Sequence, residues 1–284
     1  MKPRFDRFIG IDWSGAKGSR HPGISLAICA IGDAAPELVT PPGRYWSREG
    51  VRNWLLSLEG DALIGFDFSY APPFVERGAY LPGDETPTNA KAFWAYVDTV
   101  SDDEDLGAAS FLDQRHRRHF YFGATDGAKA DYRHLRQCET LYNDGRGGKP
   151  ATVFDAIGAA QVAKASFAGM RLLHHLNRAL PVWPFDTRPE RGPAIVEIYT
   201  RIAARAAGVA KGRSKVRDAA SLDVVLAALG SRPHAPLSRY TDHDTDAIMT
   251  AAWLRANAAR AELWHPPLLT PEIARTEGWT FGVL

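Results

Sequence analysis

A strand-like apolar run near the start of the chain carries a carboxylate, and no other sequence feature limits the fold as much. In FIGIDWSG, residues 8–15, small or polar residues alternate with Ile9, Ile11 and Trp13. This period of two is typical of a strand with two different faces. Asp12 lies on the small, polar face. Because burying an unpartnered carboxylate costs several kcal/mol, the rest of the chain must supply groups that neutralise Asp12.

Composition limits the class of protein. With 284 residues, 45% of them hydrophobic, the chain can bury a substantial globular core. The formal net charge of +1 neither demands nor excludes a polyanionic partner, so any basic surface must be local. Cys29 and Cys138 lack CxxC spacing, which argues against a disulfide framework and against a structural zinc site. A reducing compartment fits these cysteines best.

The sequence favours a cytoplasmic protein without membrane segments. The first residues, MKPRFDRFIGID, are charged and lack the apolar core of a signal peptide. No apolar run approaches the roughly 20 residues that a membrane helix needs. We therefore expect a cytoplasmic location and no membrane partner.

The hydrophobic pattern predicts an α/β fold in which a three-strand meander continues into parallel strands, with helices on both faces. Strands are expected at residues 8–14, 23–32, within 36–47, 62–70 and 194–200. Helices are expected at 47–58, 153–176, 216–229 and 241–259. Ser47 is the predicted N-cap of the first helix, and Gly158 and Gly169 favour a break in the second.

A long segment separates the fourth and fifth strands. Residues 74–190, approximately, show mostly helical and loop patterns and are too long for a simple connection. We expect one domain over residues 1–284 with a large helical insertion at this place. The insertion is predicted to cover the active cleft.

Acidic residues recur where the predicted fold brings chain segments together. Parallel pairing of the first and fourth strands would place Asp12 and Asp67 close to each other. The last helix would add Asp246 and, three residues earlier on the same face, His243. Glu197 lies near the end of the fifth strand. Such a pocket suits two Mg²⁺ or Mn²⁺ ions about 3.5–4 Å apart, which favour phosphodiester hydrolysis.

Each of these residues also has a structural alternative. Asp12 may be read as a turn residue before SGAKG, and Asp67 as an acceptor for backbone N–H groups before FSYAPP. Glu197 can be a solvated residue of an edge strand. Asp242 and Asp244 suit the first turn of a helix, where Thr241 and Asp244 resemble a capping box. His243 can be a ligand, a general base or a capping residue.

Basic residues near the predicted pocket are candidates for binding phosphates. These are Lys17, Arg133, Arg136, Lys211, Arg213 and Lys215. Salt bridges to Glu139 are the alternative for the two arginines of the insertion, and a solvated loop is the alternative for the KGRSK segment. The run QRHRRHFYF at 114–122 could stack bases and bind phosphates, but a solvated helix face is the preferred interpretation.

Several motifs resemble the RNase H-like superfamily and, within it, the predicted nuclease family called domain of unknown function family 429. The motifs are GIDWSG, GFDFSYAPP, VEIYT, HDTDAIMTAAWL, GKPATVFDAIGAAQVAKASFAGM, WPFD and EGWTFGV. The resemblance implies that Asp12, Asp67 and Asp246 are metal ligands and that His243 is a ligand or handles protons. Glu197 matches the narrow family only. The His243-x-x-Asp246 spacing also resembles Holliday-junction resolvases.

The sequence thus predicts a metal-dependent nuclease that acts on nucleic acid, with DNA, RNA and small nucleotides left open as substrates. One alternative is an inactive module of the same fold that binds nucleic acid or a protein. Another is a phosphotransferase of the actin and sugar-kinase superfamily, which usually needs a duplicated core and Gly-rich phosphate turns. A homodimer would suit a branched junction, although no sequence feature requires one.

Overall fold

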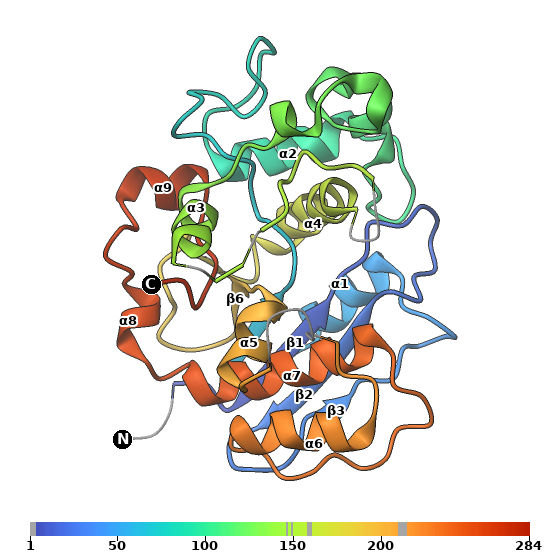
Figure 1. Cartoon of the computed structure of the whole chain (residues 1–284), viewed down its shortest axis with the longest axis vertical. Coiled ribbons are helices and arrows are strands. Elements are labelled where there is room, and N and C mark those ends of the chain that lie inside the picture. Colours follow the sequence, from blue (N-terminus) through green and yellow to red (C-terminus); the bar gives the residue numbers. More distant parts are fainter. Residues whose placement is uncertain (1–3, 146, 149, 158–160, 210–214) are drawn as a thin grey trace.

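The chain forms a six-stranded mixed sheet flanked by helices, as the sequence predicts (Figure 1). The computed structural model describes residues 4–145, 147–148, 150–157, 161–209 and 215–284. The strand order is β3-β2-β1-β4-β6-β5, with antiparallel pairing among β1, β2 and β3 and parallel pairing among the others. This arrangement is consistent with RNase H-like topology. The strands are β1 (Arg7–Asp12), β2 (Ser25–Ala30), β3 (Glu37–Leu38), β4 (Ala62–Phe66), β5 (Val182–Trp183) and β6 (Ala194–Glu197).

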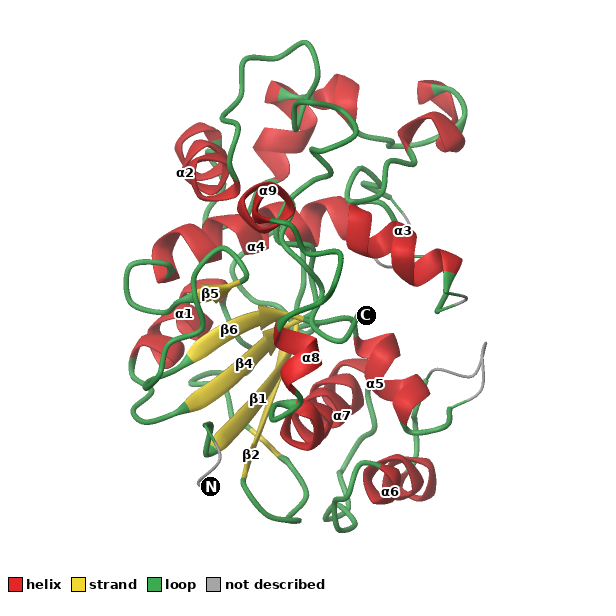
Figure 2. Ribbon diagram, turned by 90° about the vertical axis from the view of Figure 1, so that its left-hand side faces the viewer, coloured by secondary structure: helices red, strands yellow, loops and turns green. Residues whose placement is uncertain are grey.

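Helices cover both faces of the sheet. Figure 2 shows α1 on one side and α5, α6 and α7 on the other, with α2, α3, α4 and α9 beyond the sheet. The helices are α1 (Arg48–Leu56), α2 (Ala90–Val100), α3 (Gln137–Asp144), α4 (Val162–Leu176), α5 (Thr200–Ala206), α6 (Ala219–Ala228), α7 (Asp242–Asn257), α8 (Ala261–Trp264) and α9 (Pro271–Thr276). As predicted, the Ser47 hydroxyl caps α1 by accepting a hydrogen bond from the Gly50 N–H at 2.9 Å.

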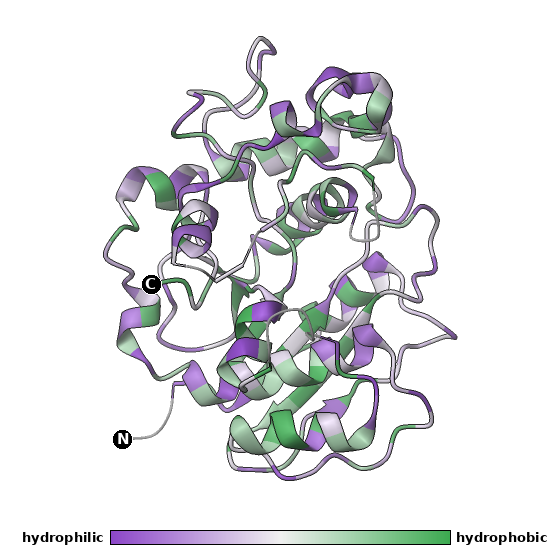
Figure 3. Ribbon diagram, in the orientation of Figure 1, coloured by the Kyte–Doolittle hydropathy of each residue, from purple (hydrophilic) through white to green (hydrophobic). Residues whose placement is uncertain are grey.

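The alternation in β1 divides the core into two parts. Ile9 and Ile11 belong to the hydrophobic cluster on the α1 and α4 side, whereas Phe8 belongs to the cluster under α7. Figure 3 shows hydrophobic residues gathered in the strands of the sheet. Asp12 shares the face of Phe8 and Gly10, so it lies on the α7 side of the sheet, where the alternation in the sequence places it.

A glycine lets α7 lie directly on β1. A Cβ atom at Gly10 would lie only 2.3 Å from the carbonyl oxygen of Ala247 and 2.7 Å from the amide nitrogen of Ala251. Only a residue without a side chain permits this backbone approach. The contact holds the first turns of α7 close to the carboxyl end of β1.

The insertion contains more irregular structure than the sequence indicates. α4 begins only at Val162, whereas residues 153–157 lie in turns and a bridge. Gly158, where we also expected a break, lies outside the described residues. Gly169 does not break α4. The glycine is needed there for packing instead, since a Cβ atom at this position would lie only 2.3 Å from the Phe68 ring. The two-residue strand β5 lies within the range 74–190 and was missed because it is so short.

Two further expectations concern thiols and membranes. Cys29 and Cys138 are both buried free cysteines. Among the described helices, none combines the length and the apolar character needed to cross a membrane.

Candidate active site

A cavity of about 590 Å³ lies where β1, β4 and β6 end and α7 begins. Residues from the sheet, from α7 and from the α3–α4 part of the insertion line it. The lining includes all five residues that the sequence analysis placed in the active site: Asp12, Asp67, Glu197, His243 and Asp246.

Strand pairing brings the first two aspartates together. β1 and β4 are parallel, and Asp12 ends β1 while Asp67 follows β4 directly. The Asp67 amide extends the pairing by donating a hydrogen bond to the Ile11 carbonyl at 3.2 Å. Because parallel strands end at the same edge, both carboxyl groups enter the same cavity.

The beginning of α7 supplies the other two side chains. The Thr241 hydroxyl caps this helix by accepting a hydrogen bond from the Asp244 N–H. His243 and Asp246 are three residues apart and therefore share a helix face. His243 Nδ1 lies 2.5 Å from Asp12 Oδ2 and donates a hydrogen bond to it. Positions 231 residues apart in the sequence thus meet directly.

The carboxyl groups hold protons strongly. Burial, followed by the charges of Asp12 and Asp67, raises the pKa of Asp246 to about 8. Burial and the Asp12 charge raise the pKa of Asp67 to about 7. Burial also raises the pKa of Asp12 despite the hydrogen bond from His243, and that same bond raises the pKa of His243. The acids therefore repel one another when ionised.

The described protein supplies little counter-charge for this repulsion. Asp67 accepts one side-chain hydrogen bond, from Thr200 Oγ1 at 2.6 Å. The Asp246 carboxylate has no hydrogen bond or ion pair with any residue in the described part of the chain. The His243 hydrogen bond lowers the pKa of Asp12, and the Lys215 charge lowers that of Asp246, but neither outweighs burial. An all-oxygen, acidic and undercompensated site matches the preference of Mg²⁺ and Mn²⁺, so the residues fit a divalent ion.

The three carboxylates are spread rather than tightly grouped. Within the described residues, the one set of three His, Cys, Asp or Glu residues whose ligand atoms all lie within 4.8 Å of one another is elsewhere, at Asp84, His116 and His119. Ligands of one Mg²⁺ ion, with bonds of about 2.1 Å, lie at most about 4.2 Å apart. As placed, the carboxylates of Asp12, Asp67 and Asp246 therefore do not all lie close enough together to bind a single Mg²⁺ ion.

Glu197 lies in a closed network rather than an open ligand position. Its side chain is 3% exposed, and its two oxygens accept hydrogen bonds from Arg136, from the Tyr70 amide at 2.8 Å and from the Thr280 hydroxyl at 2.6 Å. Arg136 is 1% exposed and also pairs with Glu139 at 2.8 Å. The arginine therefore forms the salt bridges that we considered as its alternative, and its guanidinium is not free for phosphate.

The other predicted cations separate into three groups. Lys215 lines the cavity and pairs with Asp242. Lys17 and Arg133 are exposed and do not line it, and Lys17 pairs with Asp113 at 3.2 Å. The remaining two candidates, Lys211 and Arg213, lie outside the described residues. The structure therefore brings one of the six predicted cations, Lys215, to the cavity with its charged group near solvent.

Sequence reasoning missed residues that follow β6. Tyr199, Thr200 and Arg201 start α5, and two of them, Tyr199 and Arg201, line the cavity. Tyr142 of α3 lines it as well, and its ring packs edge-on against that of Tyr199 at 5.6 Å. Their place in the sequence could have identified them, because side chains that directly follow a parallel strand face the same cleft as Asp12 and Asp67.

The other two acids at the start of α7, of which Asp242 also lines the cavity, have partners within the protein. Asp244 accepts hydrogen bonds from Ser25 Oγ at 2.8 Å and from Thr241 Oγ1 at 2.7 Å. Asp242 forms ion pairs with Lys215 and Arg217. The capping interpretation of the helix start therefore accounts for Asp244.

Comparison with known proteins adds no relative: no protein-family model matches the sequence, and searches of curated proteins and of solved structures gave no match. The geometry and chemistry of the cavity therefore carry the functional conclusion.

Proposed function

We propose that this protein is an RNase H-like nuclease that hydrolyses phosphodiester bonds of nucleic acid with the help of Mg²⁺ or Mn²⁺. One observation carries the proposal: three carboxylates, from the ends of β1 and β4 and from α7, line one cavity in which burial and neighbouring acids raise their pKa values. The proposal includes that the chain belongs to the nuclease family that its motifs resemble. The cytoplasmic location and a homodimer remain predictions from the sequence.

Asp12, Asp67 and Asp246 would hold the ions. When bound, two divalent ions supply charge that stabilises the attacking and leaving oxygens of a phosphodiester. Thr200 orients the Asp67 carboxylate through its 2.6 Å hydrogen bond. His243 holds a proton against Asp12 and is half-exposed, so it can exchange that proton with solvent or substrate.

The cavity also offers groups that suit a nucleotide. Arg201 and Lys215 provide positive charge at its lining, and the exposed guanidinium of Arg201 lies over the Tyr199 ring. Such cations contact phosphates, and tyrosine rings stack on bases. A volume of about 590 Å³ is in the range of small-molecule sites and accommodates a nucleotide around the scissile phosphate.

The test is calorimetric titration of Mn²⁺ into metal-free protein, followed by cleavage assays on single-stranded, duplex and branched DNA and RNA. Asp12→Asn, Asp67→Asn and Asp246→Asn should each lose most of the Mn²⁺ affinity. Asp33→Asn, at an exposed surface ion pair, is the matched control and should bind like the wild type.

Two other results would change the conclusion. Absence of Mn²⁺ binding at millimolar concentration, or binding unchanged in all three variants, would reject the metal centre and favour an RNase H-like binding module. Metal binding without cleavage of any nucleic acid would reject the nuclease and keep the centre. A phosphotransferase is disfavoured, since the described chain contains a single sheet of this kind.

A further inference from the structure

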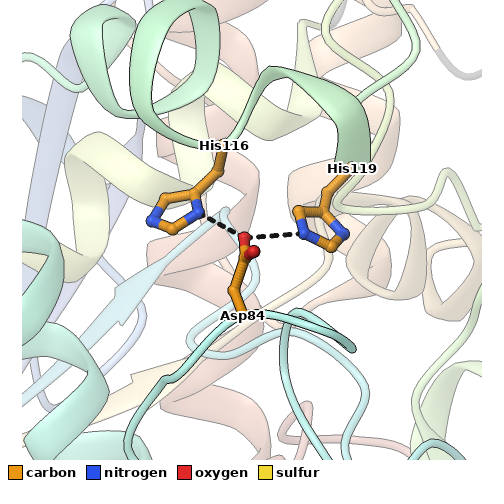
Figure 4. Close-up of side chains that lie close together, drawn as sticks. All are labelled: Asp84, His116 and His119. Atoms are coloured by element: carbon orange, nitrogen blue, oxygen red, sulfur yellow. Dashed lines mark hydrogen bonds and ion pairs between the residues drawn. The ribbon is translucent and has the colours of Figure 1, made fainter.

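A second group of ligand-type side chains lies in the insertion, away from the cavity described above. Asp84 follows a loop after Tyr80, whereas His116 and His119 belong to the tight turns after the π-helical segment Phe111–Arg115. Figure 4 shows the two imidazole rings pointing at the Asp84 carboxylate from opposite sides. We propose that Asp84, His116 and His119 form a zinc site that is distinct from the carboxylate cleft.

The three side chains converge on one point. His116 Nδ1 lies 2.7 Å and His119 Nε2 lies 2.9 Å from the same oxygen, Asp84 Oδ2. All three ligand atoms lie within 4.8 Å of one another. Zn²⁺ bonds to nitrogen and oxygen of about 2.0–2.1 Å in a tetrahedral site place ligand atoms about 3.3 Å apart. An opening of about half an ångström would therefore admit the ion.

The local backbone places the two histidines on one side. Residues 117–119 form a 3-10 turn, and the His119 amide donates to the His116 carbonyl at 3.0 Å. Side chains three residues apart are eclipsed in a 3-10 turn, so the His-x-x-His spacing directs both rings the same way. We expected this run to be a solvated helix face, but the histidines are only 7% and 8% exposed. For them that expectation is wrong.

A neighbouring tyrosine fixes one of the rings. The Tyr96 hydroxyl lies 2.9 Å from His116 Nε2, the nitrogen that does not face Asp84. Metal-bound histidines commonly use their second ring nitrogen for such a bond, which sets the tautomer and the ring orientation. In the metal-free protein Nδ1–H of His116 donates to Asp84; when the proton moves to Nε2 and is donated to the Tyr96 hydroxyl, Nδ1 carries the lone pair that a metal needs.

The ligand set selects zinc over the ions expected in the cleft. Two imidazoles and one carboxylate are typical zinc ligands, whereas Mg²⁺ prefers oxygen ligands alone. The spacing of the two cysteines argues against a structural zinc site that contains them. This group contains no cysteine, so their spacing does not count against it. Three protein ligands leave the fourth position to water or another small ligand.

One residue opposes the cation. The Arg118 guanidinium donates a hydrogen bond to Asp84 Oδ1, and its Nε lies 3.3 Å from His119 Nε2. Its side chain is mostly exposed, so it can turn to solvent when a metal enters. Removing this charge should therefore tighten zinc binding, whereas a purely structural cluster predicts no metal dependence at all.

The test is titration of the metal-free protein with Zn²⁺, and with Co²⁺ as a spectroscopic probe, both followed in the presence of excess Mg²⁺. We expect one equivalent of Zn²⁺ to bind, and Co²⁺ to give the visible absorption of a four-coordinate site. His119→Gln should weaken binding at least about 10-fold, and Arg118→Gln should strengthen it about 2- to 5-fold. His175→Gln, beside Asp98 at 3.2 Å, is the matched control.

A second measurement uses the wild-type protein, so its result does not depend on whether a variant folds. In wild-type protein, Zn²⁺ should shift the side-chain nitrogen resonances of His116 and His119 and leave those of His174 and His175 in place. Asp12→Asn should retain the Zn²⁺ site, which separates this result from failure of the proposed nuclease centre. No shift at His116 and His119, or equal loss of affinity in His175→Gln, would overturn the proposal.

Discussion

The carboxylate cleft and the histidine group both bring metal-ligand side chains together, but they treat charge in opposite ways. In the cleft, burial and neighbouring acids raise the pKa of Asp246 to about 8. At the histidine group, burial would raise the pKa of Asp84, yet hydrogen bonds from His116 and His119 outweigh burial and lower it. A cation is therefore needed to relieve repulsion in the cleft, whereas at Asp84 it must displace partners that the protein already provides.

The largest expected effect comes from removing counter-charge beneath the cleft. Arg136→Met should destabilise the protein by about 3–5 kcal/mol, because it leaves Glu139 and Glu197 buried without their cation. Chemical denaturation measures this change. Arg133→Met is the exposed control and should change stability by less than about 0.5 kcal/mol. A similarly small change in Arg136→Met would mean that burying Glu139 and Glu197 does not depend on this cation.

The next test breaks one site and leaves the other intact. Asp67→Asn should lower Mn²⁺ affinity and any cleavage rate by at least about 100-fold, while Zn²⁺ binding at Asp84 stays as in the wild type. Paired titrations with the two metals measure this. Loss of both affinities together would show that the two regions are energetically coupled and not separate sites.

Replacing Asp246 and replacing Asp84 should change the pH dependence of the free energy of unfolding in opposite directions. Since the folded state raises the pKa of Asp246, ionising it costs stability, and this cost grows as pH rises from about 4 to about 8. Asp246→Asn should therefore stabilise metal-free protein by several kcal/mol, about 5 at most, at pH 8 and leave it nearly unchanged at pH 4.

Asp84→Asn should do the reverse. Its carboxylate has a lowered pKa, so the stability it contributes is present above about pH 4 and is lost as pH falls below that value. The variant should lose about 1–2 kcal/mol at pH 7. Denaturation curves of both variants at pH 4 and pH 8 would contradict the comparison if the two shifts had the same sign.

The last expected effect is proton release on metal binding. Asp67, with a pKa of about 7, and Asp246, with a pKa of about 8, must lose protons to bind Mn²⁺. Because both acids are largely protonated at pH 6, Mn²⁺ affinity should rise by more than about 100-fold between pH 6 and pH 8. Calorimetry in buffers of different ionisation enthalpy counts the protons, and a pH-independent affinity would mean that the acids are already ionised.

The sequence predicted the sheet, α1, α7 and the meeting of Asp12, Asp67 and Asp246 at one cavity, because these depend on local periodicity and on parallel pairing. It could not show that Arg136 and Thr280 close around Glu197, since those contacts join residues 61 and 83 positions away. The start of α4 was predicted too early, because the pattern of residues 153–157 looks helical although these residues lie in turns and a bridge.

The histidine group escaped prediction for a related reason. His116 and His119 have a recognisable spacing, but Asp84 is 32 residues earlier, on an irregular loop that no periodicity positions. Only the packing of the insertion brings the carboxylate to the imidazoles. Irregular segments of this kind are where sequence patterns carry the least information about side-chain neighbours.

The contact at Gly10 has a consequence for which ions the cleft accepts. At Gly10 the nearest atoms of α7 are the Ala247 carbonyl oxygen, the Ala251 amide nitrogen and Cβ of Thr250, so no long flexible side chain lies there to absorb a change in spacing. The carboxylates of Asp12 and Asp246 are thus carried by a rigid frame that resists expansion. We expect such a frame to discriminate by ionic radius, accepting Mg²⁺ and Mn²⁺ and binding the larger Ca²⁺ less well.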